Sequence, residues 1–199
     1  MKTIIVIMAL IAIAFTACNN GNNTVTENKN SADNVKGKLV PTDTIAAASV
    51  AGITHAVSVK AIVAAYLQLK NAFANDNTTL AAAAGTSLQE AFKTFDKTAL
   101  TATQKKTFED VEDDAKEHAE HIGKNGGNIA HQREHFEMLS KDMYDLIKAF
   151  GGGQVLYKDF CPMYNNNKGA FWISETKEIK NPYLGKAMPT CGTVKEEIK

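Results

Sequence analysis

Four segments of this chain carry apolar side chains that recur with the 3.6-residue period of an α-helix, and no other feature constrains the fold as strongly. They cover about residues 55–74, 78–95, 101–122 and 128–150. The connections between them are short, which favours antiparallel packing of neighbouring helices. The sequence therefore predicts a mainly α fold: an antiparallel, up-down four-helix bundle, assigned to residues 44–153.

Polar residues at the ends of these segments support the assignment. Asp76 or Asn77 can cap the second helix, and Asn128 can cap the fourth. The third opens with a Thr-x-x-Gln sequence at Thr101, which is typical of a capping box. Glycines follow the third and fourth segments, where a helix commonly ends.

The pattern changes after residue 153. Residues 154–160 (QVLYKDF) and 169–174 (GAFWIS) are rich in β-forming residues, and Pro182 and Pro189 exclude a helix further on. We expect residues 154–199 to form a small β-rich appendage packed on the bundle. A core this small needs a disulfide or a metal ion to stabilise it.

The first 18 residues have the pattern of a secretory signal: a basic start, a short apolar run and small residues before Cys18. The sequence FTAC resembles a bacterial lipobox, which predicts lipidation of Cys18 and attachment to the periplasmic side of a membrane. Cleavage and release without lipid is the alternative. Residues 19–43 have few large apolar side chains and are predicted to be a flexible tether.

Charge and motifs exclude several functional classes. The chain has 22 basic and 22 acidic residues, with no basic stripe that would bind nucleic acid. It has no Gly-x-Ser-x-Gly, no His-Glu-x-x-His and no phosphate-binding glycine loop. We therefore predict that the protein is not an enzyme.

Two cysteines of the predicted appendage each stand near a methionine: Cys161 near Met163, and Cys191 near Met188. In an oxidising compartment the cysteines can form a disulfide that closes a loop of about 31 residues, worth roughly 3.7 kcal/mol. Alternatively, the two thiolates and two thioethers can bind a soft ion such as Cu(I). Both interpretations remain open on the residues alone.

Two longer stretches resemble a family of bacterial extracytoplasmic domains of uncharacterised biochemistry. They are QREHFEMLSKDMYDLIKAF at residues 132–150 and FCPMYNNNKGAFWISETKEIKNPYLGKAMPTCG at residues 160–192. Members of that family occur as free lipoproteins and as appendages of adaptor subunits in copper and silver efflux systems. The resemblance implies extracytoplasmic handling of metal, with a heavy-metal efflux adaptor or another periplasmic copper protein as partner. No hairpin or barrel domain of such an adaptor is recognisable here.

The leading hypothesis is thus a lipid-anchored protein that binds Cu(I) or Ag(I) and buffers it or delivers it to an efflux partner. Its predicted ligands are Cys161, Met163, Met188 and Cys191. Aromatic residues nearby in sequence, Trp172 and Tyr164, are candidates for shielding the ion or for packing. The alternative is a structural or interaction module that a Cys161–Cys191 disulfide stabilises.

Four histidines lie on the third and fourth predicted helices, and their imidazoles could converge. His118 falls in an apolar stripe and is predicted to be buried and hydrogen-bonded. His121 and His131 are predicted to be solvated. His135 lies in the family-like stretch and is the candidate fifth ligand of the sulfur site, or a donor that orients it.

Overall fold

The computed structural model describes residues 58–199. The predicted signal peptide with Cys18, the tether and the first residues assigned to the helical bundle lie outside this range. Within it, none of the helices is long and apolar enough to cross a membrane.

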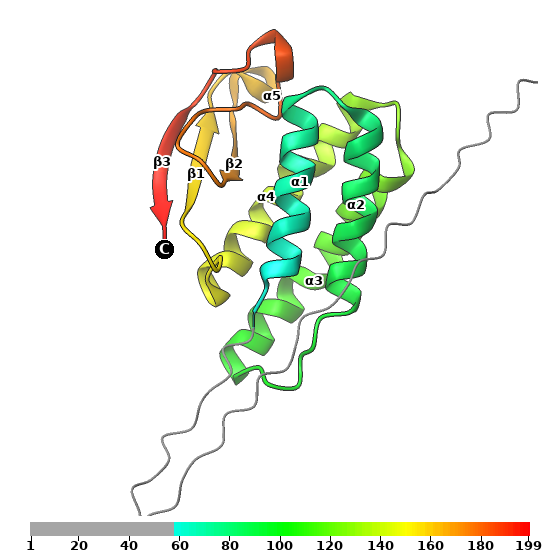
Figure 1. The fold of residues 1–199 in the computed structure, drawn as a ribbon, viewed down its shortest axis with the longest axis vertical. Helices are drawn as coiled ribbons and strands as arrows, with labels where there is room; N and C mark the ends of the chain where they lie inside the picture. The colour runs from blue at the N-terminus through cyan, green and yellow to red at the C-terminus, as the bar shows by residue number, and fades with distance from the viewer. Residues whose placement is uncertain (1–57) are drawn as a thin grey trace, which may run out of the picture. The chain divides into compact units, whose positions relative to one another are not determined.

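Four long helices make the fold mainly helical: α1 (Lys60–Ala74), α2 (Thr78–Lys93), α3 (Ala102–Lys124) and α4 (Ile129–Phe150). We call them the helical body. Helices consecutive in sequence pack against one another, and α1 also contacts α4 (Figure 1). The period of the apolar residues thus predicted every long helix of the described range.

The predicted capping residues are in place. The Asn77 side chain accepts a hydrogen bond from the Leu80 N–H, and Asn128 accepts one from the His131 N–H. Thr101 forms the full capping box with Gln104. These bonds satisfy backbone donors that have no partner inside the helix. Of the two candidates for the cap of α2, Asn77 is the one used.

A three-stranded antiparallel sheet follows the helices: β1 (Leu156–Cys161), β2 (Ala170–Ser174) and β3 (Thr193–Ile198), in the order β2-β1-β3. The sheet lies against α1 and α4, which β2 contacts (Figure 1). The predicted β-rich appendage is therefore a sheet seated on the helical body.

The helices and the sheet share one core and belong to one compact unit. The Tyr66 hydroxyl of α1 accepts a hydrogen bond from the Ile173 N–H of β2 at 3.1 Å and lies 2.8 Å from the Ser140 hydroxyl of α4. Its ring stacks on Phe136 with centroids 5.3 Å apart. Trp172 of β2 is completely buried. Removal of the sheet would therefore expose the core of the helices.

Arg133 of α4 fixes the loop before β3 to the helical body. Its Nε donates to the Pro182 carbonyl at 2.7 Å, and its Nη2 donates to the Phe73 carbonyl and to Asp76, at 2.8 and 2.7 Å. Gly185 (φ 51°) begins a short 3-10 helix, η1 (Gly185–Ala187), directly above this ion pair, where a Cβ would collide with Asp76. The loop is thus held at the end of α1.

Candidate metal centres

The fold brings Cys161 and Cys191 into contact. Cys161 ends β1, Cys191 lies two residues before β3, and their Sγ atoms are 3.0 Å apart. Both are thiols here, sharing a hydrogen bond rather than a covalent bond. Cys161 is completely buried, whereas Cys191 is partly exposed. The pair is therefore accessible from the side of Cys191 only.

Asn181 holds the loop that presents Cys191. This buried side chain donates from Nδ2 to the Cys191 carbonyl at 2.6 Å, and its Oδ1 accepts from the Tyr183 N–H at 2.8 Å. The Asn181 N–H donates to the Pro189 carbonyl at 2.9 Å. Each bond satisfies a polar group that burial would otherwise leave unpaired. The Asn-Pro-Tyr sequence thus organises the loop from within.

The environment of Cys191 favours its protonated form. The hydrogen bond with the Cys161 thiol raises the pKa of Cys191, and burial adds to this, while the Met163 N–H opposes it. A thiol must lose its proton to ligate a metal, so metal binding here would release protons.

The two predicted methionine ligands adjoin the cysteines through their backbones. The Met163 N–H points to the sulfur of Cys191, and the Met188 carbonyl accepts from the Cys191 N–H at 3.2 Å. Their side chains are at the surface: Met163 is 49% exposed and Met188 is 37% exposed. Neither is a core gap-filler.

The two aromatic residues predicted to shield or pack have packing partners. Trp172 meets Tyr183 edge-on at 5.9 Å, and a Cβ on Gly192, the neighbour of Cys191, would lie 2.9 Å from the Trp172 ring. Tyr164 stacks on Tyr183 at 4.4 Å. Trp172 therefore packs directly beneath the residue that follows Cys191.

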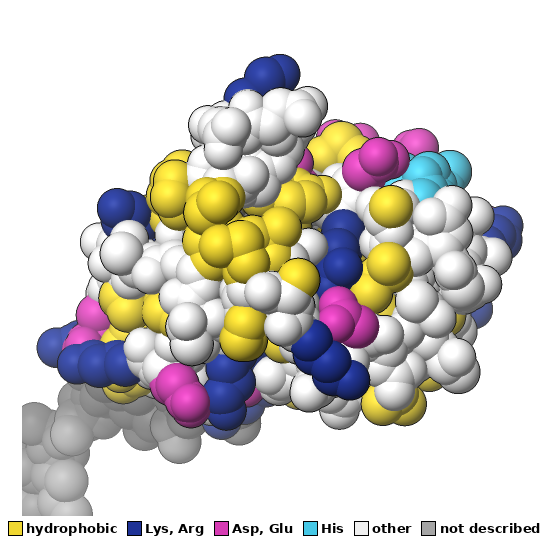
Figure 2. All heavy atoms as spheres, turned by 90° about the horizontal axis from the view of Figure 1, so that it is seen from above, with side chains coloured by type: hydrophobic (Ala, Val, Ile, Leu, Met, Phe, Trp, Pro, Cys, Tyr) yellow, Lys and Arg dark blue, Asp and Glu magenta, His cyan; other side chains and the backbone are white. Residues whose placement is uncertain are grey.

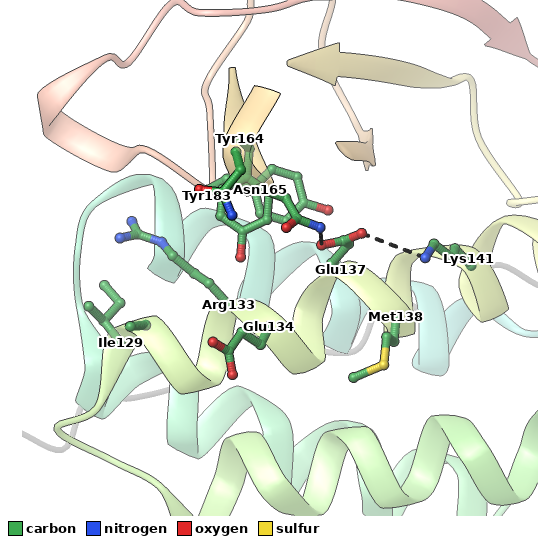
Figure 3. A pocket seen from close by; sticks show the side chains of 11 residues that line it. Ile129, Arg133, Glu134, Glu137, Met138, Lys141, Tyr164, Asn165 and Tyr183 are labelled. Carbon is green, nitrogen blue, oxygen red and sulfur yellow. Dashed lines mark hydrogen bonds and ion pairs between the residues drawn. The ribbon is translucent and has the colours of Figure 1, made fainter. Parts of the chain in front are cut away.

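A surface cleft of about 700 Å³ opens between α4 and the segment after Met163 (Figure 3). Tyr164 and Tyr183 line its appendage side, and Glu137 on α4 accepts a hydrogen bond from Asn165 at 3.2 Å. Burial raises the pKa of Tyr164 to about 12. Lys141 lies 3.6 Å from Glu137. The cleft therefore lies between α4 and the residues that directly follow Cys161-Pro162-Met163.

A second cluster lies between α3 and α4, where His121, His131 and His135 each offer a ligand atom within 4.8 Å of the others. The His121 and His135 rings stack at 4.3 Å, and the His131 ring meets His135 edge-on at 4.7 Å. Nδ1 of His118 lies 3.2 Å from Nδ1 of His135. Figure 2 shows histidine side chains gathered at the surface beside acidic ones.

The sequence predicted that these imidazoles could converge, and three of them lie together. His121 and His131, predicted to be solvated, are half-exposed. His135, the candidate fifth ligand of the sulfur site, has His118 as its hydrogen-bonding partner. His118 is half-buried and hydrogen-bonded, close to the expectation.

The pKa values of the two inner histidines are lowered. Burial and the neighbouring imidazoles lower the pKa of His135 to about 4. Burial also lowers the pKa of His118, against the attraction of Glu117 and Asp114. Both rings are therefore neutral at physiological pH, the form that binds a metal ion.

No curated protein and no solved structure matches the chain. Residues 62–154 match the model of a family described as a protein of unknown function (DUF3347). That segment covers nearly the whole helical body and ends before β1. The helical part of this chain thus matches an uncharacterised domain family, whose description assigns it no activity.

Proposed function

We propose that the protein binds a soft monovalent ion, Cu(I) or Ag(I), through Cys161 and Cys191, and buffers the ion or delivers it to a heavy-metal efflux partner. Met163 and Met188 would supply thioether ligands at the exposed side. The proposal includes a lipid anchor at Cys18 on the periplasmic side of a membrane and a helical body arranged as an antiparallel up-down bundle.

The observation that carries the proposal is the contact between the two thiols. Their Sγ atoms lie 3.0 Å apart although 30 residues separate them in sequence. Thiolate is a soft donor that selects Cu(I) over harder divalent ions. Two sulfurs attached to a sheet and to a loop held by Asn181 would supply a metal site with little reorganisation.

Exposure supports transfer as well as binding. Cys191 is partly exposed, and the side chains of Met163 and Met188, whose backbones adjoin it, are exposed as well. An incoming ligand can therefore approach one sulfur while the buried Cys161 retains the ion. Metal passes between proteins by such stepwise exchange of ligands, which a fully enclosed site would prevent.

Anaerobic titration of the reduced protein with Cu(I), against a chromogenic Cu(I) chelator, tests the proposal. We expect one equivalent to bind, and Cys161→Ser/Cys191→Ser to abolish this binding. Met163→Leu and Met188→Leu should weaken it less. The matched control is Met138→Leu, because Met138 is another exposed methionine, at 38%, and lies on α4. Binding that survives loss of both cysteines would exclude the site, provided that circular dichroism shows each variant folded.

The same contact favours a second candidate, a structural or interaction module with a Cys161–Cys191 disulfide. Oxidation would close a loop of about 31 residues and stabilise the appendage by roughly 3.7 kcal/mol. The cleft between α4 and Tyr164 would then be the docking surface. This candidate predicts that protein isolated from its host resists alkylation until it is reduced, which mass spectrometry measures, and that it binds no Cu(I).

A further inference from the structure

We propose that His121, His131 and His135 form a second metal site, which binds a divalent first-row transition ion of the Zn²⁺ or Cu²⁺ class. The inference uses none of the sulfur ligands and does not depend on the Cu(I) proposal. It rests on the geometry of the three imidazoles between α3 and α4 and on the partners of their second ring nitrogens.

The backbone already brings the three ligands together. His131 and His135 are one turn apart on the same face of α4, and His121 reaches them from α3. Their ligand atoms lie within 4.8 Å of one another. A tetrahedral ion with bonds of about 2.0–2.1 Å needs nitrogens roughly 3.3 Å apart. The His121 and His131 side chains are 45% and 35% exposed, so they can close this gap by rotation.

Each of the three rings has a polar group near one nitrogen. Nδ1 of His131 lies within hydrogen-bond distance of Glu134, at 3.4 Å, whereas Nε2 of His121 lies 3.8 Å from Glu117, too far for a direct hydrogen bond. Metal-binding histidines usually donate their other N–H to a carboxylate or a similar acceptor, which orients the ring and increases its basicity. The remaining nitrogens, Nε2 of His131 and Nδ1 of His121, would carry the ion.

His118 would act as the positioning residue for His135. Their Nδ1 atoms are 3.2 Å apart, so one ring donates and the other accepts. This contact leaves Nε2 of His135 as the ligand atom. The bond links α3 to α4 and fixes the His135 ring.

The donor set and its charges indicate the class of ion. Imidazole suits Zn²⁺, Cu²⁺ and Ni²⁺, whereas the sulfur pair suits monovalent soft ions. Asp114 and Glu117 on α3 and Glu134 on α4 place negative charge near the rings, against the positive charge of Lys141. Three protein ligands at an exposed site leave a fourth position for water or an exogenous ligand.

Calorimetric titration with Zn²⁺, repeated with Cu²⁺, tests the inference on the full chain. We expect one equivalent to bind to Cys161→Ser/Cys191→Ser, which removes the sulfur pair. His121→Ala or His131→Ala should weaken binding about 100-fold or more, and His118→Ala about 10-fold. His55→Ala is the matched control and should change nothing, since His55 is the one histidine outside the four discussed here.

A spectroscopic readout separates ligation from a merely structural role. In ¹⁵N-labelled protein, Zn²⁺ should shift one imidazole nitrogen in each of His121, His131 and His135, and leave the His55 signals unchanged. The inference is overturned if neither ion binds at micromolar concentration, or if binding persists in His121→Ala/His131→Ala. It is overturned equally if binding disappears with the cysteines but not with the histidines. Failure of the Cu(I) titration alone would leave it intact.

Discussion

Asp159 is an acidic residue in an unfavourable place. It is completely buried on β1, and both of its carboxylate oxygens lack a hydrogen-bond partner. Burial raises its pKa to about 7; the charge of Lys70 opposes this rise, and that of Glu175 adds to it. Lys70 is itself committed to Glu175, at 2.8 Å. The folded protein therefore prefers Asp159 protonated, whereas the unfolded chain ionises it at its ordinary pKa.

Replacement of Asp159 by Asn should change how stability depends on pH. Between about pH 4 and pH 7 the folded state keeps a proton that the unfolded state has released, so the free energy of unfolding falls as pH rises through this window. Asn cannot ionise, so Asp159→Asn should lack this contribution to the decrease in the free energy of unfolding. We expect the variant to be more stable than the native chain at pH 7, by up to about 4 kcal/mol.

Urea unfolding at a series of pH values between 4 and 8 measures this difference. Asp142, whose pKa burial also raises to about 7, is present in both proteins and cancels in the comparison. Asp110→Asn is the control, because Asp110 is exposed and pairs with Lys106 on the surface of α3. Parallel pH curves for the native chain and Asp159→Asn would contradict the assignment of the burial cost to this carboxylate.

Helices α2 and α3 approach closely at a pair of glycines. A Cβ built on Gly85 would lie 2.8 Å from the Ala119 carbonyl and 3.0 Å from the Gly123 nitrogen. On Gly123, a Cβ would meet the Thr86 hydroxyl at 3.0 Å. Glycine in a helix normally destabilises it by roughly 0.5–1 kcal/mol relative to alanine. Here the close contact between backbones offsets that penalty.

Gly85→Ala should therefore destabilise the protein despite its better helix propensity. We expect a loss of about 1–3 kcal/mol, because the neighbouring atoms are backbone and the helices must separate. Thermal or urea unfolding followed by circular dichroism measures it. Gly126→Ala is the control: its Cβ would meet only the Ala82 methyl, at 3.5 Å, and should change stability by less than about 0.5 kcal/mol. Equal effects at the two positions would contradict the argument.

The helices could be predicted because their signals are local. A capping box at Thr101 and Gln104, or a cap at Asn128, involves residues three positions apart, so the sequence alone specifies it. Strand β3 has no such signal. Half of its sequence, TVKEEI, is charged, because it is an edge strand that buries only Ile198. The sequence predicted a β-rich region there but not this strand.

The candidate sites depend on contacts between residues far apart in sequence, which the helical period does not predict. The spacing of His131 and His135 places them on one face of α4, but their contact with His121 depends on the register between α3 and α4. The contact of Cys161 with Cys191 likewise depends on a loop held by the side chain of Asn181. Sequence reasoning named the residues, whereas their grouping required the packed structure.

Within residues 58–199, the core does not divide at the boundary of the family match. That match ends at residue 154, before β1. Yet Tyr66 on α1 hydrogen-bonds the backbone of Ile173 on β2, and Trp172 of β2 is completely buried in the core cluster that includes the helices. Arg133 adds a further bond from α4 to the Pro182 carbonyl. The helices and the sheet should therefore lose structure together.

Unfolding should thus occur as one transition by two independent probes. Trp172 is the only tryptophan of the chain and lies in the sheet, so its fluorescence reports on the appendage. Far-ultraviolet circular dichroism reports mainly on the four helices. We expect the two curves to coincide in urea. We also expect Arg133→Ala to move both midpoints equally. A fluorescence midpoint well below that of the dichroism would show that the sheet unfolds separately.

This shared core has a consequence for how such a unit can be inherited. A recombination event that joined only the segment equivalent to residues 62–154 to another gene would transfer the helices without the sheet that packs on them. Such a chimera would expose aromatic surface and be prone to aggregation or proteolysis. Viable exchanges between genes should therefore break after Ile198, with the helices and the sheet transmitted as a single heritable block.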